Sequence, residues 1–269
     1  MKIGIFAKTF ARTSVEAVFD AVQAHGLSAV QFNLACAGLP SLPDEIDPAL
    51  AGEIRRAAEK RGIEIAAVSG TFNMIHPDPQ VRQAGLRRLR VLAAACRELG
   101  TRIITLCTGT RDPEDMWRWH PENASPEAWA DLLEGMEEAL KTAEQAQVTL
   151  AFEPEHGNVV HSAVRGRALL DALRSPYLKV VIDPANLIDP GGGAGTGHVL
   201  DEAFDLLGGG IVLAHAKDRA PGGVVCPAGQ GMVDFPRYVR LLRDCGYSGP
   251  LVLHGLAEAD VNGAAGYLS

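Results

Sequence analysis

The stretch GGGIVLAHAKDRA, residues 208–220, begins as a buried strand and ends in ionisable side chains. Residues 211–214 are apolar, and His215, Lys217 and Asp218 follow within four positions. Such groups are costly to bury in a dry interior without partners. A strand that ends in them is therefore expected to end at a polar rim.

Apolar runs of strand length alternate with helical patterns along the chain. Helix signals include the capping Ser and closing Gly of residues 14–26 and the Ser-Pro-Glu that opens residues 125–145. The expected strands are 2–7, 29–34, 63–69, 102–108, 148–154, 178–183, 211–216 and 250–255. Eight strands, each followed by a helix until the last, predict an α/β fold, a single (β/α)8 TIM barrel of parallel strands over residues 1–269. The last helix is expected to be weak or truncated, because residues 257–269 are rich in Gly and Ala.

The alternative architecture is an open doubly wound sheet, which requires a Gly-rich turn after the first strand. Residues 6–14, FAKTFARTS, contain no Gly. The Gly-rich stretch 191–197 lacks the G-x-G-x-x-G spacing and a Lys-Ser/Thr end, so it is interpreted as a flexible loop rather than a phosphate loop.

Composition excludes several classes of protein. The 269 residues are 47% hydrophobic and 22% charged, as in ordinary globular proteins, and the net charge of -8 opposes nucleic-acid binding. Five scattered cysteines without a C-x-x-C pair favour a reducing compartment. The apolar run before Lys8 is too short for a signal peptide, and no run reaches the length of about 18 residues that a membrane helix needs. A cytoplasmic location without membrane contact is expected.

Four consecutive strands end in side chains that can meet at one point. Side chains alternate between the two faces of a strand, and successive strands of a parallel barrel open onto a common mouth. These residues are Glu153, Asp183, His215 and His254, about one βαβ unit apart, and each shares a strand face with the apolar residue two positions earlier. Carboxylate and imidazole ligands without a thiolate indicate a divalent metal site. Manganese is the expected ion, with Mg²⁺, Co²⁺ and Zn²⁺ as alternatives.

Almost the whole chain, roughly residues 2–256, resembles the xylose isomerase-like barrels of the sugar-phosphate isomerase/epimerase superfamily. The matching stretches are VSGTFNMIHPD with His76, FEPE with Glu153, VVIDPANL with Asp183, AHAKD with His215, and GQGMVDF before the last strong helix. The resemblance implies a divalent metal held by a Glu on strand five, an Asp on strand six, a His near strand seven and a Glu on strand eight. The first three correspond to Glu153, Asp183 and His215.

Two positions depart from the pattern of that superfamily. Asn186 stands where many relatives have a His, and His254 stands where the sugar epimerases have a Glu. Those epimerases use carboxylates from strands five and eight on opposite faces of the substrate. His254 is therefore predicted either to complete the metal site or to act as the second base.

The main hypothesis is metal-dependent isomerisation or epimerisation of a sugar or sugar derivative by α-proton abstraction and an enediolate. In it, Glu153 is ligand and base, His254 or Glu155 serves the opposite face, and Lys217 offsets oxyanion charge. The alternatives are a metal-dependent dehydratase of the inosose type on the same scaffold and a non-catalytic, metabolite-binding relative. A nuclease of the abasic-site type is opposed by Asn186 and by the acidic balance.

The predicted substrate contacts are His76, Glu155, Asn186 and Trp117, and the partner is a small carbohydrate. For His76 the alternative is a structural role in its loop. Residues 109–129 hold all three tryptophans, so Trp117 and Trp119 are predicted to cover the mouth or to form a subunit contact in a homo-oligomer. Gln31 and Asn33, on one face of the second strand, are predicted to fill the inner layer of the barrel, with contact to substrate hydroxyls as the alternative.

Overall fold

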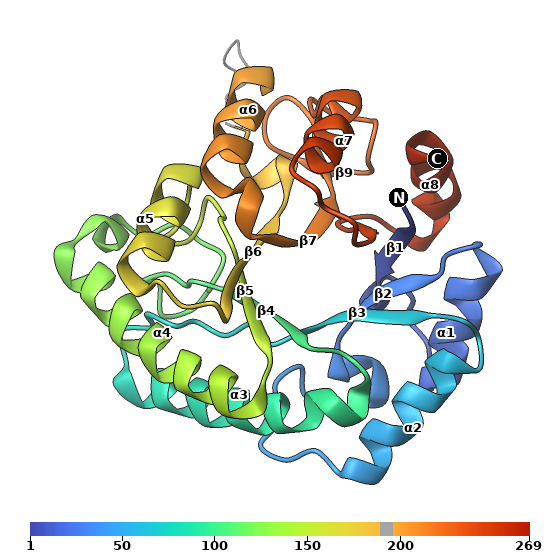
Figure 1. The fold of residues 1–269 in the computed structure, drawn as a ribbon, viewed down its shortest axis with the longest axis horizontal. Helices are drawn as coiled ribbons and strands as arrows, with labels where there is room; N and C mark the ends of the chain where they lie inside the picture. The colour runs from blue at the N-terminus through green and yellow to red at the C-terminus, as the bar shows by residue number, and fades with distance from the viewer. Residues whose placement is uncertain (189–195) are drawn as a thin grey trace.

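The computed structural model describes residues 1–188 and 196–269, and its centre is a closed barrel of parallel strands (Figure 1). The strands lie in the order β1-β10-β7-β6-β5-β4-β3-β2. They are β1 (Ile3–Phe6), β2 (Ala29–Phe32), β3 (Glu64–Ser69), β4 (Ile103–Cys107), β5 (Thr149–Glu153), β6 (Leu178–Ile182), β7 (Ile211–Ala216) and β10 (Leu251–Leu253). The helices outside the barrel are α1 (Val15–Ala24), α2 (Pro48–Glu59), α3 (Pro79–Leu99), α4 (Pro126–Ala146), α5 (Ala163–Leu173), α6 (Thr196–Leu207), α7 (Phe235–Asp244) and α8 (Val261–Leu268). The predicted TIM barrel is confirmed.

Six helices of the outer ring begin where a short side chain accepts a backbone N–H. Ser14 accepts from the N–H of Ala17, and Ser125 accepts from the N–H of Ala128, as the sequence predicts for these two caps. The same kind of cap precedes four other helices: Asp47, Asp78, Ser162 and Asp234. A cap of this kind satisfies one of the otherwise unpaired N–H groups of the first helical turn.

The chain departs from the simple alternation near its C-terminal end. After β7, a two-stranded antiparallel hairpin of β8 (Asp218–Arg219) and β9 (Val225–Cys226) precedes α7, and the sequence analysis did not predict it. The short last helix is confirmed, since α8 has only eight residues. The stretch 191–197, interpreted as a loop, lies mostly outside the described residues, and α6 already begins at Thr196.

The interior of the barrel confirms the expected alternation of side chains. A separate buried apolar cluster fills it, and four of its members are Ala151, Val181, Leu213 and Val252. Each of these lies two positions before one of the ionisable residues that end β5, β6, β7 and β10. The ionisable side chains therefore lie one layer above an apolar floor, on the side of the barrel where the strands end.

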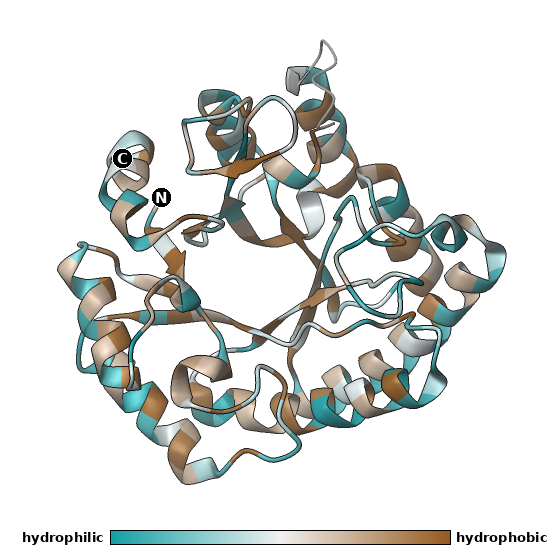
Figure 2. Ribbon diagram, turned by 180° about the vertical axis from the view of Figure 1, so that it is seen from behind, coloured by the Kyte–Doolittle hydropathy of each residue, from teal (hydrophilic) through white to brown (hydrophobic). Residues whose placement is uncertain are grey.

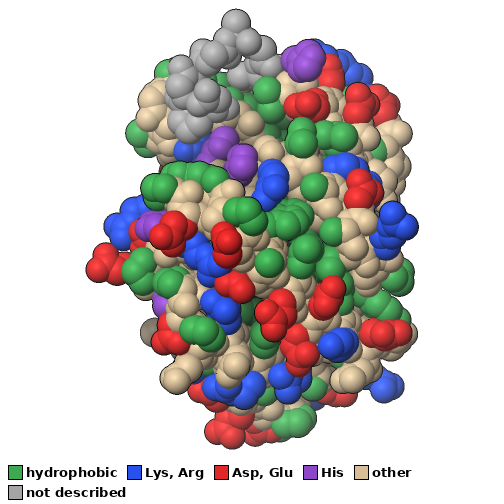
Figure 3. All heavy atoms as spheres, turned by 90° about the vertical axis from the view of Figure 1, so that its left-hand side faces the viewer, with side chains coloured by type: hydrophobic (Ala, Val, Ile, Leu, Met, Phe, Trp, Pro, Cys, Tyr) green, Lys and Arg blue, Asp and Glu red, His purple; other side chains and the backbone are tan. Residues whose placement is uncertain are grey.

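The larger core lies between the strands and the helices. Apolar residues concentrate along the strands in Figure 2, whereas hydrophilic residues lie mainly on the outer helix faces. The face seen in Figure 3 carries acidic and basic side chains interspersed, with no field of one sign.

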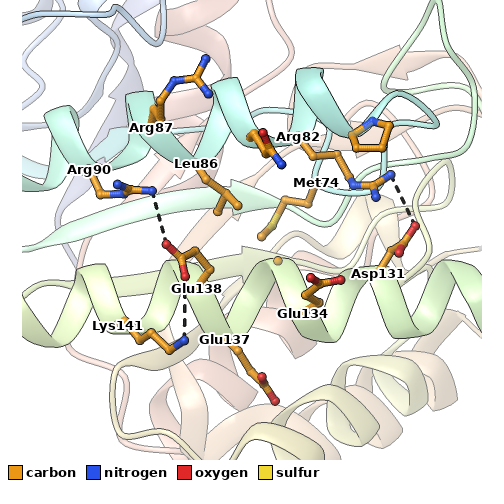
Figure 4. A pocket seen from close by; sticks show the side chains of 13 residues that line it. Met74, Arg82, Leu86, Arg87, Arg90, Asp131, Glu134, Glu137, Glu138 and Lys141 are labelled. Atoms are coloured by element: carbon orange, nitrogen blue, oxygen red, sulfur yellow. Dashed lines mark hydrogen bonds and ion pairs between the residues drawn. The ribbon is translucent and has the colours of Figure 1, made fainter.

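A hollow on the outside of the barrel runs between α3 and α4 and has a volume of about 580 Å³ (Figure 4). Charges pair across it: Arg90 contacts Glu138 at 3.3 Å, and Arg82 contacts Asp131 at 3.4 Å. No strand end contributes to its lining. It is a charged seam between two packed helices and does not belong to the barrel mouth.

Among the described helices, none combines the length and the hydrophobicity needed to cross a membrane.

Candidate metal centre and active site

The candidate site is a cavity of about 440 Å³ at the barrel mouth. Its walls are built by the ends of the strands and by the loops that follow them. The lining residues are Phe6, Lys8, Gln31, Asn33, Ser41, Ser69, Thr71, Thr105, Leu106, Cys107, Met116, Trp117, Glu153, Glu155, His215, Lys217 and His254. Six of the predicted site residues (Trp117, Glu153, Glu155, His215, Lys217 and His254) are therefore in one cavity, and Asp183 lies against His215 and Lys217.

Three potential ligand atoms come together at the mouth. Asp183, His215 and His254 each offer one such atom, and these atoms lie within 4.8 Å of one another. Of these atoms, the buried His254 Nδ1 has no partner among the described residues, whereas Asp183 Oδ2 and His215 Nδ1 contact each other at 3.4 Å and contact the charged groups of Lys217 and Glu153 at 3.0 and 3.5 Å. A buried polar atom without a partner is costly, and two further ligand atoms converge beside it, so the group indicates a position for a cation. Two ligands on opposite sides of one ion lie about 4.0–4.6 Å apart, which is close to the observed spread.

Asp183 is oriented by its own backbone. It precedes a short 3-10 helix, Pro184–Asn186, and its Oδ1 accepts the N–H of Ala185 at 3.0 Å. That bond leaves Oδ2 facing the mouth, where Lys217 Nζ lies 3.0 Å away. Burial would raise the pKa of Asp183, but the neighbouring cations of Lys217 and His215 lower it well below its usual range. Asp183 is therefore an ionised carboxylate.

His215 is held from behind by an amide. Its Nε2 lies 2.8 Å from Gln31 Oε1, and Gln31 Nε2 donates to the hydroxyls of Ser69 and Thr105. An Nε2–H that donates to Gln31 leaves Nδ1 directed at the mouth, 3.4 Å from Asp183 Oδ2 and 3.5 Å from Glu153 Oε2. Burial alone would lower the pKa of His215, but these two carboxylates raise it to about 9. Asp183 and Glu153 thus stabilise the protonated ring of His215, and they place negative charge at the position where a cation would bind.

His254 follows β10 and stacks on His215. The two rings are 5.0 Å apart and nearly parallel, and Phe6 lies 5.1 Å from His254 on another side. Burial, reinforced by the positive charges of His215 and Lys217, lowers the pKa of His254 to about 3. A neutral imidazole with a free Nδ1 is the form that ligates a metal ion.

Glu153 lies beside this group rather than within it. Its Oε1 accepts from Asn186 Nδ2 at 2.6 Å, and Asn186 Oδ1 in turn lies 3.4 Å from the guanidinium of Arg219. Burial would raise the pKa of Glu153, but the charge and hydrogen bond of His215 lower it overall. Glu153 is therefore an ionised carboxylate at the cavity wall, available as a fourth ligand or as a base.

Glu155 and Lys217 complete the charged lining. Burial, together with the negative charge of Glu153, raises the pKa of Glu155 to about 8, so this carboxyl holds a proton near neutral pH. Burial would lower the pKa of Lys217, but the surrounding carboxylates, Asp183 first, raise it. Two carboxyl groups on one strand end thus differ in protonation state because their neighbours differ.

The other predicted site residues differ in whether they line the cavity. Trp117 lines the cavity, whereas Asn186 reaches it only through Glu153. His76 is placed away from it: its Nε2 contacts Pro113 O at 3.2 Å, and its Nδ1 accepts the N–H of Asp78 at 3.0 Å. Those bonds fit the structural alternative given above for His76. Glu258, beyond β10, is bound by Arg12 and does not line the cavity.

Gln31 is the site residue whose role the sequence analysis missed. It was predicted to fill the inner layer, and it does lie buried there, 4% exposed, yet it contacts a candidate ligand. The alternation of side chains along the second strand indicated that Gln31 points into the barrel, and this was the one sequence signal for its role. The pairing with His215, which lies 184 positions away, depends on closure of the barrel and has no local signature.

The segment between β4 and α4 is a folded wall of the cavity. Asp112 accepts the N–H groups of Glu114 and Asp115 and pairs with Arg118, and Asn158 donates to Met116 O at 3.2 Å. These bonds fix the backbone on both sides of Trp117. Trp117 presents its side chain at the cavity with 48% of its surface exposed.

The fold and the residues at its mouth define a class. Residues 19–266 match the family model described as Xylose isomerase-like TIM barrel, and the chain belongs to that family.

The individual relatives share low sequence identity with this chain. L-ribulose-5-phosphate 3-epimerase UlaE of Salmonella paratyphi A is 28% identical over 201 residues, which are 72% of this chain and 64% of UlaE. The matched part of the chain thus spans less than two thirds of that relative. Two solved structures share the fold. D-psicose 3-epimerase with D-tagatose, from Clostridium cellulolyticum H10, is 17% identical with a TM-score of 0.75, covering 100% and 98% of the two chains. The IOLI protein with a binding zinc atom is 14% identical with a TM-score of 0.75, covering 100% and 96%.

Proposed function

We propose that this protein is a divalent-metal-dependent isomerase or epimerase of a sugar or sugar derivative. The observation that carries the proposal is the convergence of three potential ligand atoms, on Asp183, His215 and His254, within 4.8 Å of one another at the mouth of a barrel. The donor set is one carboxylate oxygen and two imidazole nitrogens, with Glu153 as the adjoining carboxylate, and it suits manganese, cobalt or zinc. Manganese is the ion we expect.

The relatives support the same chemistry. UlaE and the structural neighbour with D-tagatose are epimerases of sugars, and the IOLI protein has a zinc atom. Sugar epimerases remove a proton beside a carbonyl group and return it. We extend only this type of reaction to the present chain.

A bound divalent cation would polarise adjacent carbonyl and hydroxyl oxygens of a substrate and so acidify the C–H between them. Glu153, ionised and facing the cavity, is the group that would accept this proton. Glu155, which holds a proton near neutral pH, would donate to a substrate oxygen. Carboxyl groups whose pKa values are driven apart in this way are typical of paired base and acid roles. The ammonium of Lys217 would stabilise negative charge on the substrate oxygen.

One observation favours a second candidate, a dehydratase on the same scaffold. Both carboxyl groups that line the cavity, Glu153 and Glu155, come from the end of β5 and the loop after it, whereas the residue after β10 is His254, which we assign to the metal. Proton transfer from one side suffices to remove a proton and expel hydroxide, but inversion at carbon needs groups on both sides of the substrate. Product mass separates the two reactions, since dehydration removes water and isomerisation leaves the mass unchanged.

The experiment is proton exchange by the manganese-loaded protein in D₂O, with a panel of ketoses and aldoses followed by NMR. We expect deuterium at the α-carbon of at least one sugar. In His254→Ala, one ligand is lost, so metal affinity should fall by about 10–100-fold or more and exchange should fall with it. His198→Ala, on α6, is the matched control and should retain both.

Exchange that persists in metal-free protein, or in His254→Ala without bound metal, would contradict the proposed role of the metal. Tight metal binding without exchange on any sugar would leave the metal centre in place and refute the sugar chemistry.

A further inference from the structure

A second hollow lies beside β10, next to the cavity of the candidate site. This hollow has a volume of about 620 Å³ and adjoins the cavity, with which it shares Phe6, Lys8 and His254. The remaining lining residues are Thr9, Val225, Pro227, Gly255, Leu256, Ala257 and Asp260. His254 thus stands at the junction, so a molecule whose reacting carbon lies near His254 can extend into the second hollow.

Apolar side chains form one wall of the second hollow. Val225 comes from the hairpin after β7, and Leu256 and Ala257 follow β10. Gly255 lets the wall close, because a Cβ there would lie 2.7 Å from Val225 Cγ1 and 3.0 Å from Lys217 Cδ. Val225 is 41% exposed and therefore presents apolar surface to a ligand.

The charges of the second hollow do not favour a phosphate. Among the described residues that line it, Lys8 is the one cation and Asp260 the one anion. Arg12, nearby in sequence, is paired with Glu258, and Arg219 donates to the carbonyl groups of Ala185 and Gly223. A phosphate is ordinarily held by several donors and an excess of positive charge.

We propose that the second hollow binds a second sugar ring, so that the substrate is an uncharged keto sugar carrying a glycosidic substituent. The apolar wall of Val225, Pro227, Leu256 and Ala257 suits the C–H face of a pyranose, and Thr9, Lys8 and Asp260 supply hydrogen-bonding groups for its hydroxyls. Sites for small ligands commonly combine an apolar lining with a few placed polar groups in this way. The inference rests on the proposed function, whose keto-sugar unit lies in the first cavity.

The test is equilibrium binding to the manganese-loaded full chain, measured by calorimetry. The probes are fructose, fructose 6-phosphate and three keto-disaccharides (turanose, lactulose and isomaltulose), which differ in the fructose hydroxyl that carries the second ring. We expect at least one disaccharide to bind at least about tenfold more tightly than fructose. Fructose 6-phosphate should gain no such advantage.

Ala257→Trp fills the second hollow and should reduce the ratio of disaccharide to fructose affinity by about tenfold. Ala259→Trp places the same side chain two positions along, outside the lining, and should leave the ratio within about twofold. Thermal unfolding of both variants shows whether each is folded.

Equal affinity for fructose and all three disaccharides, or preference for fructose 6-phosphate, would overturn the inference. So would an equal loss of fructose and disaccharide affinity in Ala257→Trp. If fructose binds and exchanges its α-proton without any gain from a second ring, only this inference fails. If no sugar binds, the proposed function fails with it.

Discussion

At the scale of single residues, the hydrogen bond between Gln31 and His215 decides which ring nitrogen faces the mouth. Ligating histidines commonly use one nitrogen for the metal and donate the other N–H to a fixed acceptor. Gln31 Oε1 is such an acceptor at 2.8 Å, and its amide is held in turn by Ser69 and Thr105. Gln31 is therefore a positioning residue for the ligand nitrogen of His215.

Gln31→Leu removes that acceptor while keeping a side chain of similar volume. We expect the dissociation constant for Mn²⁺ to rise by about 10–100-fold, the usual effect of losing an outer partner of a ligand. Calorimetric titration measures the constant, and Gln23→Leu, at an exposed position on α1, is the control that should leave it unchanged. Equal affinity in Gln31→Leu and the unaltered protein would show that barrel packing alone orients the ring.

Strand parity predicted which residues face the mouth, because alternation is a local property of the backbone. Glu153, His215 and His254 line the cavity as the sequence indicates, and Asp183 faces the same ligand group. The sequence does not predict their individual pKa directions, since these depend on charges that come from other strands. The sequence also predicted a substrate contact for His76, because His76 lies in a motif that resembles the family. In the structure, its ring is instead bonded to the backbone of Pro113 and Asp78.

At the scale of elements, the segment between β4 and α4 was predicted either to cover the mouth or to contact another subunit. Its backbone is fixed against the loop after β5, where a Cβ on Gly157 would lie 1.9 Å from Trp117 O. Trp117 lines the cavity, whereas Trp119 packs edge-on against His161 at 5.6 Å. The sequence showed the tryptophans, but the bonds that fix them join residues far apart in the chain.

Trp117→Ala removes the aromatic wall from the cavity. We expect KM for the sugar to rise by about 5–20-fold with a smaller change in kcat, because the lost contact is made to bound substrate and transition state alike. Steady-state kinetics measures both constants. Trp119→Ala should leave KM unchanged, and an equal effect of the two substitutions would contradict the assignment of Trp117 to the cavity.

The Asp112–Arg118 pair gives this segment a pH dependence. The hydrogen bond from Arg118, followed by the N–H groups of Asp115 and Glu114, lowers the pKa of Asp112 below its usual value. A carboxyl with a lowered pKa in the folded state stabilises the fold above its unfolded pKa, and this contribution is lost as the pH falls further. Asp112→Asn should therefore reduce the free energy of unfolding at pH 7, and the difference from the unaltered protein should shrink below about pH 4.

Urea unfolding across this pH range measures the difference. Asp244→Asn, at the last residue of α7, removes the same charge outside the segment and should show a smaller difference at pH 7. A destabilisation by Asp112→Asn that stays constant down to about pH 3 would mean that lost packing, rather than the ion pair, is responsible.

At the scale of the whole molecule, closure of the barrel brings the site together. Eight parallel strands place the ends of β5, β6, β7 and β10 around one mouth, with Ala151, Val181, Leu213 and Val252 as the floor beneath. The eight-fold alternation of strand and helix predicted this architecture directly. The β8–β9 hairpin was not predicted, because its two-residue strands are too short to give a periodic signal.

The second hollow also belongs to this scale, since it forms where the hairpin, β1 and the end of β10 meet. No single stretch of sequence contains its walls.

The central claim is that Asp183, His215 and His254 bind one divalent cation, and anomalous scattering from a crystal soaked in Mn²⁺ tests it most directly. We predict a single strong peak at the barrel mouth, about 2.0–2.3 Å from Asp183 Oδ2, His215 Nδ1 and His254 Nδ1. In a His254→Ala crystal soaked identically, the peak should weaken or disappear. A fully occupied peak elsewhere, or no peak at the mouth at saturating Mn²⁺, would contradict the claim.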